Sequence, residues 1–153
     1  MVKISNVLFT TDFSEDSAYA LPYARDLAEK FGAKLYILHV INNPISSIYG
    51  EPHGDYLAME ANARNKTREM MSKYDSVLRD FPNHELLIKE GDVVEKILDA
   101  VREKAVDTLV LGTHGGGALR HFLIGSTTRK LLTSVHCPVL AVRHPERPSA
   151  TKG

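Results

Sequence analysis

Short apolar runs alternate along this chain with longer segments in which apolar residues recur every three or four positions. The short runs predict strands at residues 3–9, 34–40, 84–89, 107–111 and 139–142. Runs of four to eight apolar residues bounded by turn signals are typical of strands buried on both faces. The longer segments fill the intervals, so the pattern predicts one helix between each pair of consecutive strands.

The first of these helices has clear end signals. Its apolar positions share one face over residues 15–31, as the 3.6-residue period of a helix requires. Ser14 is a suitable N-terminal cap, and Gly32 stands where a left-handed C-terminal cap belongs. Pro22 falls inside the helix and predicts a local bend, because proline removes one backbone hydrogen bond.

The remaining helices are marked by their start residues. Asp55 is a plausible cap for a helix at 56–79, and Asp92 for a short helix that follows the third strand. A last helix is expected at 126–134. The segment between the second strand and its helix is rich in Pro, Gly, Asn and Ser, which predicts a long irregular loop.

Alternating strands and helices predict an α/β fold, in which helices cover both faces of a five-stranded, mostly parallel sheet. We expect a three-layer, doubly wound sandwich with right-handed crossovers. The length predicts one domain, residues 1–145, followed by a polar, proline-broken tail at 146–153 that frays. Ligands of such sheets bind beyond the carboxyl ends of the strands, where the strand order reverses.

Composition and charge exclude several classes of protein. Lysine plus arginine equals aspartate plus glutamate at 19 each, which argues against a nucleic-acid-binding face. The single cysteine, Cys137, permits no internal disulfide. The first residues do not form a signal peptide, and no apolar run approaches the length of a membrane span. We therefore expect a cytoplasmic protein with neither nucleic-acid nor membrane partners.

The segment after the fourth strand carries the candidate chemistry. Gly112 and Gly115 are separated by two residues, and Gly125 follows with Ser126 directly after it. Glycines let backbone N–H groups approach phosphate oxygens, and a helix start attracts anions. This spacing favours a polyphosphate site. The structural alternative is that the glycines only make turns and Ser126 only caps a helix.

The same residues resemble a known family. G-T-H-G, nine further residues and G-S-T match the glycine pattern of the universal stress protein family, in its ATP-binding subgroup. The resemblance extends to V-L-F-T-T-D-F-S-E-D-S at the first strand, L-H-V at the second and C-P-V-L-A-V-R at the last. It covers nearly the whole chain. It implies the Rossmann-like strand order 3-2-1-4-5 of adenine-nucleotide α-hydrolase-like folds, and ATP, or AMP or ADP, as ligand with Mg²⁺.

The resemblance also implies roles for individual residues. Asp12 should bond the ribose or reach Mg²⁺ through water, and the Val40 backbone should meet the adenine edge. No residue is expected to be catalytic or a direct metal ligand. The full set of nucleotide-binding positions that it implies is Thr10, Thr11, Asp12, Val40, Leu111, Gly112, His114, Gly115, Gly125, Ser126, Thr127 and Thr128.

One departure from the family pattern concerns charge. Many members carry a basic residue after the second glycine, whereas this chain has Gly116 and Gly117, which leaves Arg120 as the nearest cation. This difference predicts a weaker hold on the phosphates. Arg129 is either a further phosphate contact or a solvated side chain.

Other catalytic chemistries lack their signatures. No pair of the seven histidines has a metal-binding spacing, and no G-x-S-x-G elbow indicates a serine hydrolase. An adenylating enzyme of related architecture would carry glycines after the first strand, where this chain has T-D-F-S-E-D-S. A kinase-like clamp of lysine or arginine is not evident either.

The sequence therefore predicts an ATP-binding regulatory module of the stress response. Nucleotide binding would order the loops at 42–54 and 115–124 and change the surface offered to a protein partner. The alternative is a slow ATPase or phosphotransferase. The last strand, 139–142, is apolar and predicts a sheet edge through which two copies pair as a homodimer.

Overall fold

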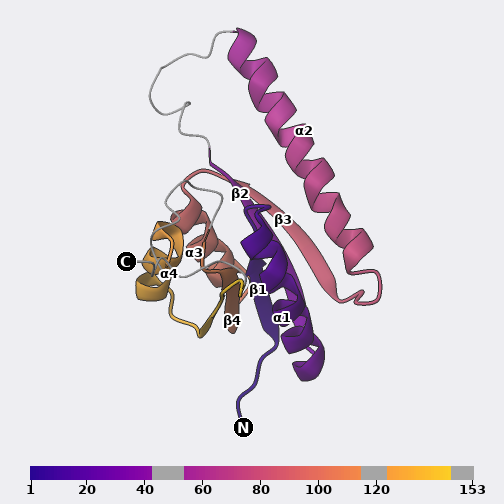
Figure 1. Cartoon of the computed structure of the whole chain (residues 1–153), viewed down its shortest axis with the longest axis vertical. Helices are drawn as coiled ribbons and strands as arrows, with labels where there is room; N and C mark the ends of the chain where they lie inside the picture. Colours follow the sequence, from indigo (N-terminus) through magenta and orange to yellow (C-terminus); the bar gives the residue numbers. More distant parts are fainter. Residues whose placement is uncertain (43–53, 115–123, 146–153) are drawn as a thin grey trace.

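The computed structural model describes residues 1–42, 54–114 and 124–145. Strands and helices alternate strictly through these residues, as predicted (Figure 1). In chain order they are β1 (Asn6–Thr10), α1 (Glu15–Phe31), β2 (Lys34–Ile41), α2 (Gly54–Val77), β3 (His84–Glu90), α3 (Val93–Glu103), β4 (Thr108–Gly112), α4 (Ser126–Ser134) and β5 (Val139–Val142).

The strands form one sheet in the order β3-β2-β1-β4-β5, and every neighbouring pair is parallel. β1 lies at the centre, where Phe9 is opposite Ile37 of β2 and Val110 of β4. The chain winds outward from β1 to β3 and then returns to lay β4 on its other side. The strand order therefore reverses between β1 and β4, which confirms the doubly wound topology.

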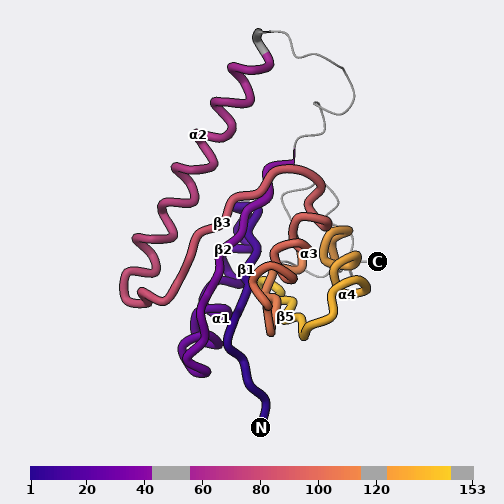
Figure 2. The backbone as a smooth tube through the Cα atoms, turned by 180° about the vertical axis from the view of Figure 1, so that it is seen from behind, coloured from indigo at the N-terminus to yellow at the C-terminus, as the bar shows by residue number. Residues whose placement is uncertain are grey.

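Two apolar cores cover the two faces of the sheet, with α1 and α2 on one side and α3 and α4 on the other (Figure 2). Along β1 the side chains alternate: Val7 and Phe9 belong to the first core and Leu8 to the second. This alternation follows from the two-residue period of a strand. It produces the expected three-layer sandwich.

Local capping signals were predicted correctly. The Ser14 hydroxyl accepts a hydrogen bond from the Ser17 N–H at 3.3 Å, and Asp92 accepts one from the Glu95 N–H. Gly32 adopts the left-handed conformation at φ 64° and ends α1. The helix continues through Pro22.

Several predicted boundaries were wrong, and α2 ends at Val77 instead of residue 79. β1 begins at Asn6 instead of residue 3, because the N–H groups of Ser5 and Asn6 donate to the Asp107 carboxylate at 2.7 and 2.9 Å. α2 begins at Gly54, so Asp55 lies inside the helix and is not its cap. An acidic residue is favourable both at a cap and in the first turn. The presence of an aspartate alone therefore does not tell which residue begins the helix.

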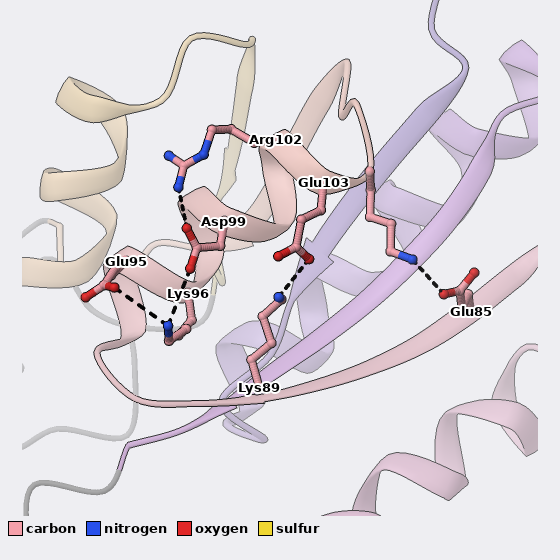
Figure 3. A network of polar contacts seen from close by, with 8 residues as sticks. Glu85, Lys89, Glu95, Lys96, Asp99, Arg102 and Glu103 are labelled. Carbon is pink, nitrogen blue, oxygen red and sulfur yellow. Dashed lines mark hydrogen bonds and ion pairs between the residues drawn. The ribbon is translucent and has the colours of Figure 1, made fainter.

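A charge network ties the edge strand β3 to its neighbours (Figure 3). Glu85 accepts hydrogen bonds from Lys34 and Lys104 at 2.6 and 3.0 Å, and both ammonium groups lie over the Tyr36 ring. These bonds, with that from Lys34 the stronger, hold the pKa of Glu85 below its usual range. Lys89 and Glu103 add a second bridge between β3 and α3. Paired charges therefore tie β3 to β2 and to the α3 segment.

Among the helices that the structure describes, none is long and apolar enough to cross a membrane.

Candidate functional site

A cleft of about 180 Å³ opens at the carboxyl ends of the central strands. It lies where the strand order reverses between β1 and β4, the usual ligand position in such sheets. The residues lining it are Thr10, Thr11, Asp12, Ser17, Leu38, His39, Val40, Val93, Ile97, Leu111, Gly112, His114, Thr127 and Thr128. Most of the predicted site residues are therefore brought together.

One wall of the cleft is apolar. Val40 of β2 and Leu111 of β4 contribute to it, and α3 adds Val93 and Ile97. Sequence reasoning missed the two residues of α3. Their signal was the Asp92 cap, which starts α3 directly after β3 and turns its first residues over the strand ends. An apolar wall of this kind suits the face of an aromatic base.

The turn between β1 and α1 presents Asp12 to the cleft. Asp12 is exposed, and its Oδ1 accepts a hydrogen bond from the Ser14 N–H at 3.0 Å. The next residue, Phe13, has a φ of 63°, which is left-handed. Because side chains other than glycine seldom adopt this region, neighbouring contacts must hold the turn in place.

Two residues behind the turn provide those contacts. The Tyr74 hydroxyl lies 2.7 Å from the Thr11 Oγ1, and the His39 Nδ1 lies 2.8 Å from the Thr11 carbonyl oxygen. The Phe13 ring packs against both, with centroid distances of 4.3 Å to His39 and 6.5 Å to Tyr74. Burial, and to a lesser extent the charge of Asp12, raise the pKa of the Tyr74 phenol. Sequence reasoning identified neither contact.

The end of β4 packs directly on α1. A Cβ added to Gly112 would lie 2.9 Å from the carbonyl carbon and oxygen of Asp16 and 3.1 Å from the Ser17 nitrogen. The Gly112 carbonyl accepts a hydrogen bond from the buried Thr128 hydroxyl at 3.2 Å. Gly112 therefore has a packing role, and Thr128 anchors α4 to the strand.

The start of α4 points to an anion. Gly125 is its N-cap and has no side chain to bond the first turn, so the N–H groups of Ser126, Thr127 and Thr128 have no partner within the helix. Such a terminus carries partial positive charge. The Gly125 N–H itself donates to the Thr113 carbonyl at 2.7 Å. Gly125 therefore contributes to the site by fixing where α4 begins, while its own N–H group is already used.

The polar part of the described lining is weakly charged. His39 and His114 are its imidazoles, and the His114 Nδ1 lies 2.9 Å from the Thr113 hydroxyl. Asp12 is its carboxylate, and neither lysine nor arginine is among these lining residues. Gly115, Gly116, Gly117 and Arg120 lie outside the described residues.

Metal ligands do not gather in the part of the chain that the structure describes. No group of three or more His, Cys, Asp or Glu side chains there could hold an ion.

Comparison with known proteins identifies the family of this chain. A universal stress protein of Methanocaldococcus jannaschii is 27% identical over 145 residues, which cover 92% of this chain and 83% of that protein. The structure of the hypothetical protein MJ0577 superposes with a TM-score of 0.83 at 23% identity, over 95% of this chain and 99% of that one.

Two further similar structures were determined with nucleotides. A universal stress protein from Archaeoglobus fulgidus in complex with dAMP has a TM-score of 0.62 and 19% identity, covering 92% of this chain and 98% of that one. A universal stress protein in complex with cAMP has a TM-score of 0.70 and 19% identity, covering 93% and 98%. The model of the universal stress protein family matches residues 3–143. The chain thus belongs to the universal stress protein family.

Proposed function

We propose that this protein is an ATP-binding regulatory module of the stress response, acting in the cytoplasm, where ATP is available. The observation that carries the proposal is the cleft at the strand ends. It combines an apolar wall, the Asp12 carboxylate and the uncapped start of α4 within one cavity. These are the chemistries that a base, a ribose and a phosphate chain respectively require.

Each part of an adenine nucleotide has a matching group. We place the base against Val40, Val93 and Ile97, which line the cleft, with its polar edge at the Val40 backbone. Asp12 accepts hydrogen bonds from ribose hydroxyls, and the first-turn N–H groups of α4 donate to phosphate oxygens. Thr127 adds a hydroxyl at the same position. The dAMP and cAMP complexes of similar proteins support an adenine nucleotide as the ligand class.

The described lining favours binding over catalysis. Backbone N–H groups and hydroxyls bind a ground state and a transition state about equally, which raises occupancy without raising the chemical rate. Phosphoryl transfer also requires a cationic clamp, and the described lining contains no lysine or arginine. We therefore favour a module whose loops at 42–54 and 115–124 order on nucleotide binding over a slow ATPase or phosphotransferase.

Calorimetric titration with ATP and Mg²⁺ tests this function. We expect saturable binding to the unmodified protein and a tenfold or greater loss of affinity in Asp12→Ala, because a hydrogen bond to a charged group contributes about 1.5–3 kcal/mol. Asp26→Ala, which removes an exposed carboxylate of α1, is the matched control and should bind normally. Absence of binding to the unmodified protein would refute the proposal.

We further propose that two copies pair through β5. This strand is an edge of the sheet, as predicted, and edge strands with exposed apolar residues tend to pair. Leu140 is 38% exposed, whereas Val142 is 6% exposed and belongs to the chain's own core. Leu140 is therefore the better residue with which to test the dimer.

Leu140→Lys is expected to give monomers in light scattering, because a charged side chain on each copy would repel its counterpart across a symmetric contact. Leu132→Lys is the matched control, since Leu132 is comparably exposed but lies on α4. A monomeric unmodified protein, or a dimer that survives Leu140→Lys, would contradict pairing through this edge.

A further inference from the structure

A chain of hydroxyl groups connects α2 to the start of α1 behind the cleft. It runs from Tyr74 through Thr11 to Ser17, with O–O distances of 2.7 and 3.1 Å. Thr11 and Ser17 line the cleft, but Tyr74 does not. Asp12 follows Thr11 directly. The hydroxyl chain therefore holds in place the residue next to the carboxylate of the site.

The direction of each hydrogen bond in this chain follows from counting protons. Ser17 donates its single hydroxyl proton to the Ser14 carbonyl at 2.9 Å, so it must accept from Thr11. Thr11 thereby uses its own proton. Its oxygen accepts the Phe13 N–H at 3.0 Å, and the remaining contact requires Tyr74 to donate. Only a protonated Tyr74 completes the chain.

The backbone of the same turn is held from β2. The Thr11 carbonyl can only accept, so the His39 Nδ1 carries a proton and donates to it. The His39 and Tyr74 rings pack against Phe13, which has the left-handed φ of 63°. Contacts from α2 and β2 thus hold both Thr11 and Phe13 in place. The backbone of Asp12, which lies between them, is restrained as a result.

We propose that Tyr74 is a positioning residue of the nucleotide site, whose donated hydrogen bond to Thr11 keeps Asp12 aimed into the cleft. The inference rests on the proposed function. Tyr74 is about 60 residues from Asp12 in sequence and acts through Thr11 without touching the nucleotide. Burial and the adjacent Asp12 charge raise the pKa of its phenol, which keeps the donor protonated at neutral and mildly alkaline pH.

Tyr74→Phe removes the donor while retaining the ring against Phe13. We expect the affinity for ATP with Mg²⁺, measured by calorimetry, to fall about threefold to tenfold, which corresponds to the loss of one hydrogen bond. Tyr23→Phe is the matched control, because Tyr23 is an exposed tyrosine of α1, and its affinity should equal that of the unmodified protein. Thr11→Val, which removes the hydroxyl that accepts from Tyr74, should also lower the affinity.

A purely structural role for Tyr74 predicts that Tyr74→Phe lowers the affinity by the same factor whether or not Asp12 and the ribose hydroxyls are present. If Tyr74 acts through Asp12, the Tyr74→Phe change should have no effect in the Asp12→Ala background, nor on 2′,3′-dideoxy-ATP, which lacks the ribose hydroxyls. The positioning role is overturned if Tyr74→Phe lowers the affinity as strongly in the Asp12→Ala background, or for 2′,3′-dideoxy-ATP, as it does for ATP in the otherwise unmodified protein. It is also overturned if Tyr74→Phe binds ATP as tightly as the unmodified protein. Failure of the unmodified protein to bind ATP overturns the proposed function itself, which separates the two results.

Discussion

Gly125→Asp is expected to lower the affinity for ATP about 100-fold while leaving the melting temperature unchanged or raised. Gly125 is the N-cap of α4 with φ −65° and ψ 159°, a conformation open to any residue. Aspartate is a preferred N-cap, so it should stabilise the helix. Its carboxylate would accept hydrogen bonds from the first-turn N–H groups and repel the phosphates. The phosphates would therefore lose both the N–H donors and the attraction of the positive helix end.

Gly125→Asn distinguishes the effect of the negative charge from the effect of occupying the first-turn N–H groups. Asparagine caps a helix as well as aspartate does but carries no charge. Its affinity for ATP should fall between those of the unmodified protein and Gly125→Asp. Calorimetry and thermal unfolding measured on all three proteins give the comparison. Undiminished ATP affinity in Gly125→Asp would show that the phosphates do not lie at the start of α4.

Gly112→Val is expected to destabilise the fold by about 3 kcal/mol, because its side chain would press on the backbone of α1. Even a Cβ would approach the Asp16 carbonyl to 2.9 Å. Backbone in the first turn of a helix cannot move aside as a flexible side chain can. Thermal unfolding should show a fall of about 6–12 °C for a domain of this size.

Gly112→Ala provides the graded comparison, with a smaller fall than Gly112→Val. Ser134→Val, an exposed substitution at the end of α4, should leave the melting temperature almost unchanged. A melting temperature for Gly112→Val within 1–2 °C of the unmodified protein would mean that β4 and α1 separate easily.

The features predicted correctly from the sequence are those that short segments encode. The short apolar runs predicted the strands, and the three- to four-residue spacing of the longer segments predicted the helices between them. Ser14, Gly32 and Asp92 act on residues within one turn of themselves. Strands alternating with helices favour a parallel sheet, and the strand order was implied by the family resemblance. The cleft position then follows from general rules for such sheets.

The features that sequence reasoning missed depend on contacts between distant segments. Phe13 has no local signal for a left-handed φ, because Tyr74 and His39 hold it from other elements. Val93 and Ile97 join the cleft only through the placement of α3. Gly112 matched a phosphate-binding pattern, but its closeness to α1 appears only when β4 and α1 are packed together.

The central position of β1 has a consequence for synthesis of the chain. β1 gains its second neighbour only when β4 is made, and the Asp107 carboxylate that bonds Ser5 lies 102 residues away from it. On the ribosome, the first strand therefore has one unpaired edge until residues 108–110 emerge. Pairing over such a separation is slow, and an open apolar edge favours aggregation. Nascent chains that stall before β4 should consequently be the form that most needs a chaperone.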